Sequence, residues 1–91
     1  METVLEIVLT FAQTRDAILA ERELLARKLP VYVMPLPTAI DAGCGLALRL
    51  AADDFLPALA ALRLAGVVPA GAYRREIAPG RIGYTHLPFP S

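Results

Sequence analysis

The chain has 91 residues, enough for one domain, and its nine basic and nine acidic side chains give a formal net charge of zero. The balanced charge argues against nucleic acid and anionic membrane surfaces as partners, because both attract a basic excess. Hydrophobic residues make up 56% of the chain, but every apolar run ends well before the about 20 residues of a membrane span, and a single cysteine cannot form an internal disulfide.

The first part of the chain predicts a strand, a helix and a second strand. Apolar residues alternate from Val4 to Phe11, which is typical of a strand with one buried face. Thr14 offers a hydroxyl that can cap a helix, and apolar positions recur at helical spacing from there to about Lys28. Pro30 ends this helix, and residues 31–34 predict a short strand.

The second part predicts another strand, another helix and a fourth strand. Alternation from Gly45 to Leu50 indicates the strand, and Asp54 can cap a helix that ends at Gly66. The fourth strand is expected from about Ala70 to Arg75. The residues that follow are rich in proline and glycine and show no strong periodicity, so we expect one domain over residues 1–76 and a tail over residues 77–91.

The order of these elements predicts an α+β fold. With right-handed crossovers it gives a ferredoxin-like βαββαβ sandwich, with a four-stranded antiparallel sheet ordered 4-1-3-2 and two helices on one face. One face of the first strand, which carries Leu5, Ile7, Leu9 and Phe11, is expected to meet the helices. The opposite face is expected to carry Glu6, Val8, Thr10, Ala47 and Arg49. We expect a homodimer to form through that open face, because a small apolar domain tends to cover exposed apolar surface with another chain.

Cys44 is the most informative residue, because it lies between Gly43 and Gly45 after a proline-containing loop. Such backbone can turn sharply and leave the sulfur accessible. In the predicted sheet the third strand starts beside the end of the first, so Cys44 is expected near Thr14 and Arg15 at the start of the first helix. Free N–H groups, the helix dipole and a guanidinium favour the thiolate, which is the nucleophilic form. The alternative is that Cys44 is a small apolar residue that only packs.

No other group of residues predicts a reactive site. A metal ion needs several converging ligands, whereas the chain has one cysteine, one histidine and scattered carboxylates, so we expect neither a metal nor a cofactor. His86 can pair with Cys44 only if residues 77–91 fold back onto the cysteine.

Three segments of the chain carry motifs that occur together in one protein family. The motifs are Phe11-x-x-Thr14-x-x-Ala17-x-x-Ala20-Glu21, Val31-x-Val33-x-Pro35-x-Pro37 and Cys44-Gly45-Leu46-Ala47-Leu48-Arg49. Together they resemble the selenium/sulfur carrier-like family, small bacterial proteins that occur alone or fused to sulfurtransferase-like domains. The resemblance covers roughly residues 4–73, and the cysteine segment is its most specific part.

The resemblance implies a carrier protein and not a turnover enzyme. Cys44 would hold sulfur or selenium as a persulfide or perselenide, a donor such as a cysteine desulfurase would load it, and an acceptor protein would unload it. Gly43 and Gly45 would give access to the sulfur, and Thr14 and Arg15 would favour the thiolate.

Two other functions stay open from the residues alone. One is a self-associating interaction module in which Cys44 is structural, and the other is a sensor that binds a small ligand between the sheets of a dimer. The opening residues do not predict a signal peptide, so we expect a cytoplasmic protein.

Overall fold

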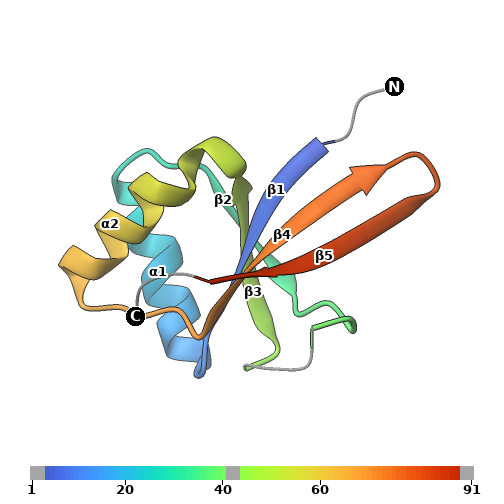
Figure 1. Ribbon diagram of the computed structural model, residues 1–91. Coiled ribbons are helices and arrows are strands. Elements are labelled where there is room, and N and C mark those ends of the chain that lie inside the picture. The colour runs from blue at the N-terminus through green and yellow to red at the C-terminus, as the bar shows by residue number, and fades with distance from the viewer. Residues whose placement is uncertain (1–3, 41–43, 89–91) are drawn as a thin grey trace.

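A five-stranded antiparallel sheet with two helices on one of its faces makes up the part of the chain that the computed structural model describes, residues 4–40 and 44–88 (Figure 1). In chain order the elements are β1 (Val4–Thr10), α1 (Thr14–Ala26), β2 (Val31–Pro35), β3 (Leu46–Ala51), the 3₁₀ turn η1 (Ala52–Asp54), α2 (Phe55–Ala65), β4 (Gly71–Ala78) and β5 (Arg81–Leu87). The strands lie in the order β2-β3-β1-β4-β5, and each neighbouring pair is antiparallel.

The prediction of a four-stranded sheet ordered 4-1-3-2 is wrong, because a fifth strand, β5, pairs with β4 and forms one edge of the sheet. Pro79 and Gly80 connect the two strands. Proline restricts its own φ to about −65° and Gly80 has a φ of +82°, as in a type II turn. Most of β5 is exposed, so its residues need not alternate between apolar and polar, and no periodicity marked the strand in the sequence.

β1 is the central strand, and its alternation places successive side chains on opposite faces of the sheet. Ile7, Leu9 and Phe11 are buried in the main core, as expected, whereas Leu5 is 47% exposed. The helices contribute to this core with Ala17, Ala20, Leu24, Ala58, Ala61 and Leu62. Both helices therefore cover the same face of the sheet, as Figure 1 shows.

The face opposite the helices is partly covered by the chain itself. Val8 and Ala47 are fully buried, because Ile40, Met34 and Leu36 pack against them. The face that was expected to be open is therefore covered in part by residues that follow β2, Leu36 and Ile40. Self-association stays a prediction.

The ends of the helices differ in part from the expectation. Thr14 is the first residue of α1 and not its cap, because the cap residue is Gln13. The carbonyl of Gln13 accepts hydrogen bonds from the N–H groups of Asp16 and Ala17, but its side chain makes no capping hydrogen bond. Asp54 precedes α2 as expected but also makes no side-chain capping bond, and Gly66 ends this helix with left-handed backbone.

Candidate functional site

Cys44 lies at the end of the sheet where β1 leads into α1. Its backbone N–H donates a hydrogen bond of 2.9 Å to the carbonyl oxygen of Phe11, the residue after β1. The carbonyl of Gly45 accepts a bond of 2.9 Å from the N–H of Leu36, which follows β2. These two bonds hold the backbone of the cysteine between the end of β1, the end of β2 and the start of β3.

The sulfur of Cys44 is half-buried. It packs against the main core, and the thiol donates a weak hydrogen bond to the carbonyl oxygen of Leu46, with 3.7 Å between Sγ and O. The sequence contains no second cysteine. Cys44 is therefore in contact with the core while part of the residue is exposed, which allows a structural or a chemical role.

Gly45 has a backbone angle that favours glycine. Its φ is +92°, a conformation that residues with a side chain rarely adopt. A Cβ atom added there would meet nothing within 4 Å, so the backbone angle and not a lack of space requires glycine. The chain turns at this residue between the cysteine and β3.

Thr14 and Arg15 are exposed in the first turn of α1. Phe11, which binds the backbone of Cys44, lies three positions before Thr14. In the described part of the chain, no hydrogen bond or ion pair joins either side chain to the cysteine. Gly43, the other residue predicted for this site, lies outside the described residues.

His86 does not pair with Cys44. Its ring makes an edge-to-face contact with Tyr73, with 5.3 Å between the ring centroids. Tyr73 belongs to the side-chain cluster on the face opposite the helices, whereas Cys44 packs against the main core on the helix side. Formation of β5 thus places the histidine and the thiol on different faces of the sheet.

Within residues 4–40 and 44–88, no three histidine, cysteine, aspartate or glutamate side chains gather in a way that could hold a metal ion. Neither described helix has the length and apolar character needed to cross a membrane.

A row of five side chains crosses the face opposite the helices, one from each strand. We call it the charged row, and it consists of Tyr32, Arg49, Glu6, Arg75 and Tyr84. The guanidinium of Arg49 lies 5.0 Å from the ring centroid of Tyr32 and donates to Glu6 Oε2 at 2.9 Å. Arg75 donates to Glu6 Oε1 at 2.5 Å and, through Nε, to the hydroxyl of Tyr84 at 3.2 Å.

Glu6 is the centre of the charged row, because one carboxylate accepts from two arginines. The hydrogen bond from Arg75 to Tyr84, together with the pairing with Glu6, raises the pKa of Arg75 above its usual value, against the effect of partial burial. The sequence placed Glu6 and Arg49 on one face, but it did not reveal the part played by Arg75 and Tyr84. Their pairing depends on β5, for which the Pro79-Gly80 turn was the available signal.

Comparison with known proteins assigns the chain to a family. Residues 6–74 match the family described as "Putative Se/S carrier protein-like", a span that includes Cys44 and ends within β4, before β5. No curated protein and no solved structure matches the chain. Because the match covers well over half of the 91 residues, the chain belongs to the Se/S carrier protein-like family.

Proposed function

We propose that the chain carries sulfur or selenium on Sγ of Cys44, as a persulfide or perselenide, from a donor protein to an acceptor protein. The observation that carries the proposal is that the family match includes the one cysteine of the sequence, a residue that is only partly buried. A second cysteine nearby would attack a loaded persulfide, close a disulfide and release the sulfur. This chain holds no second thiol that could do so.

Loading is a thiol exchange that needs no oxidant or reductant. The thiolate of Cys44 attacks the terminal sulfur of a persulfide on the donor, and a bond forms between Sγ and that sulfur. The sulfur–sulfur bond of the donor breaks at the same time, and its electron pair leaves with the donor thiolate. Unloading repeats the step with a thiolate of the acceptor as the nucleophile, and the selenium reaction has the same balance.

The backbone around Cys44 supports a fixed position for the Cα atom that carries the reacting side chain. The bond to Phe11 and the turn at Gly45 hold the backbone of the cysteine in place. The protonated thiol donates to the carbonyl of Leu46, but the thiolate has no proton to donate. We therefore expect the sulfur to turn away from that carbonyl and toward solvent when it loses its proton.

The competing function is an interaction module in which Cys44 only packs. Contact between the cysteine and the main core favours it, because buried cysteine behaves as a small apolar residue. A packed thiol reacts slowly with iodoacetamide at neutral pH until the protein unfolds, whereas a carrier thiol reacts in the folded state.

Intact-mass spectrometry tests the proposal directly. The reduced chain is incubated with a cysteine desulfurase and cysteine, and we expect an added mass of about 32 Da, one sulfur atom, that dithiothreitol removes. Cys44→Ser is the control and should gain no mass. A wild-type chain that stays unmodified, or an adduct of equal yield on the serine variant, would overturn the proposal.

A further inference from the structure

The outer edge of β5 is an open sheet edge. β5 ends the strand order, so one side of its backbone has no partner strand within the described residues, and Figure 1 shows the β4–β5 hairpin extending away from the helices. β2, at the other edge, has only five residues, follows Pro30 and ends in Pro35. Proline protects an edge because it cannot donate a backbone hydrogen bond, and β5 contains none.

Three residues of β5 direct their backbone groups away from β4. The two-residue turn makes Ala78 and Arg81 a hydrogen-bonded pair, and such pairs alternate with pairs that are not hydrogen-bonded. The N–H and C=O groups of Ile82, Tyr84 and His86 therefore point outward along the open edge. Tyr84 is the central residue of the seven in this strand.

We propose that a second copy of the chain pairs with this edge, β5 against β5, in antiparallel orientation about a two-fold axis at Tyr84. An axis at the central residue aligns the two strands over their full length, and the outward groups of Ile82 then bind those of the partner's His86. The two sheets become one continuous sheet of ten strands, and neither copy keeps an open edge at β5.

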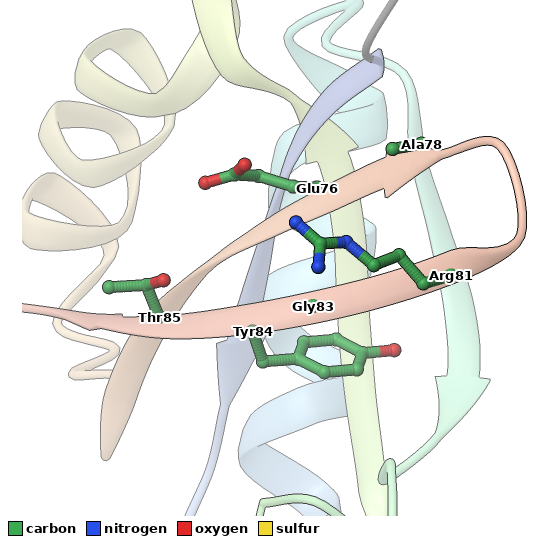
Figure 2. A pocket seen from close by; sticks show the side chains of 6 residues that line it. All are labelled: Glu76, Ala78, Arg81, Gly83, Tyr84 and Thr85. Atoms are coloured by element: carbon green, nitrogen blue, oxygen red, sulfur yellow. The ribbon is translucent and has the colours of Figure 1, made fainter.

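On the face of the β4–β5 hairpin that is turned toward the helices, the side chains leave room for those of a second copy. In this register Gly83 lies opposite the partner's Thr85. Gly83 is one of the residues that line a hollow of about 310 Å³, together with Glu76, Ala78, Arg81, Tyr84 and Thr85 (Figure 2). A small hydroxyl side chain opposite the glycine can enter the hollow and donate a hydrogen bond to the carboxylate of Glu76.

Charge also favours a second copy as the occupant. Arg81 is the only lysine, arginine, aspartate or glutamate of β5, and in this register it lies opposite the partner's Leu87, so the two Arg81 side chains do not face each other. On the other face, the pairing brings the two Tyr84 rings together and covers Ile82, which is 52% exposed in the single chain. The pairing does not cover Cys44, because the cysteine lies just before the start of β3 and two strands, β1 and β4, separate β3 from β5.

Sedimentation velocity of the full chain tests the pairing. The Cys44→Ser variant is used, because it cannot form a disulfide between copies. We expect the mass to rise with concentration from the monomer to twice that value. Ile82→Pro removes an outward N–H without removing a bond to β4, and it should raise the dimer dissociation constant at least about tenfold while circular dichroism stays unchanged.

Cross-linking tests the position of the axis. In the Cys44→Ser background, Tyr84→Cys places one thiol from each copy opposite the other, and a short bis-maleimide should link them into dimers. Tyr32→Cys is the matched control, an exposed tyrosine on the same face of the sheet at the other edge, and it should not cross-link. A monomer at all concentrations, or equal cross-linking of both variants, would overturn the inference.

Discussion

Gly45 shows how one backbone angle fixes the surroundings of the thiol. The cysteine is held by Phe11 on one side, and the chain must turn at Gly45 before β3 can pair with β1. The sequence indicated this turn, because a cysteine between two glycines is typical of sharply bending backbone. It could not show that Thr14 follows the helix cap instead of forming it, since Gln13 and Thr14 are both polar and the choice depends on backbone angles.

Gly45→Ala should lower the free energy of unfolding by about 1–2 kcal/mol, because alanine is strained at a φ of +92° although its Cβ meets nothing. Gly83→Ala is the matched control, since its Cβ also meets nothing and its φ is not positive. That change should be neutral or slightly stabilising when both are measured at concentrations where the chain is monomeric. Urea unfolding measures both, and equal losses would show that the angle at Gly45 is not the cause.

Cys44→Ser should change the free energy of unfolding by less than about 1.5 kcal/mol, because the hydroxyl is nearly the same size as the thiol and can also donate to Leu46. The same variant loses the capacity for a sulfur adduct. A loss of several kcal/mol would instead indicate that contact with the core is the main role of the cysteine.

Arg15→Glu should slow the reaction of Cys44 with iodoacetamide by about two- to threefold, because a negative charge at the start of α1 disfavours the thiolate. Salt should weaken the effect, since Arg15 is exposed. Arg22→Glu makes the same change of charge two turns further along the helix and should have little effect. Equal rates for both variants and the wild type would show that the helix start does not act on the thiol.

At the scale of elements, α2 shows why the sequence predicted a helix but not its orientation. Arg63 is the only charged residue in Phe55–Ala65, so almost any face of this helix is apolar. The structure buries Ala58, Ala61 and Leu62. Leu64 stays 77% exposed, and nothing in the composition of the helix separates it from Leu62.

Leu62→Ala should lower the free energy of unfolding by about 2–5 kcal/mol, because it leaves a cavity between α2 and the sheet. Leu64→Ala removes the same atoms from the same helix and should cost less than about 1 kcal/mol, since the side chain is exposed. Thermal unfolding of the two variants measures the difference. Similar losses would mean that α2 is rotated about its axis.

The strand that the sequence did not predict is also the least buried one. Each of the other strands places at least one residue in the main core, and the burial of one face produced the alternation that revealed β1 and β3. In β5 only Leu87 packs against that core. Its pairing with β4 follows from the turn at Pro79 and Gly80, so turn chemistry and not periodicity was the signal for this strand.

At the scale of the whole molecule, the charged row connects all five strands across one face. Its central residue, Glu6, lies on the central strand and reaches Arg49 on β3 and Arg75 on β4. Sequence alternation was enough to place Glu6 and Arg49 on that face, because the face of each residue depends only on its position along the strand. The pairing with Arg75 also depends on the register between β1 and β4, which no short-range pattern encodes.

Glu6→Gln should lower the free energy of unfolding by about 1–2 kcal/mol, because it leaves Arg49 and the mostly buried Arg75 without a charged partner. Glu76→Gln is the control, since Glu76 pairs with Arg74 where both side chains are more than 40% exposed. That change should cost less than about 0.5 kcal/mol. Equal losses in urea unfolding would show that Glu6 does not act as the shared acceptor.

The central position of β1 also sets the order in which the molecule can form during synthesis. The hydroxyl of Thr10 at the end of β1 donates to the carbonyl of Gly71 on β4, a residue made 61 positions later. At about 5–20 residues per second, the ribosome needs about 3–12 s to cover that distance. During this interval the side of β1 that pairs with β4 has no partner strand. The nascent chain therefore completes its sheet only after the β4–β5 hairpin has emerged from the ribosome.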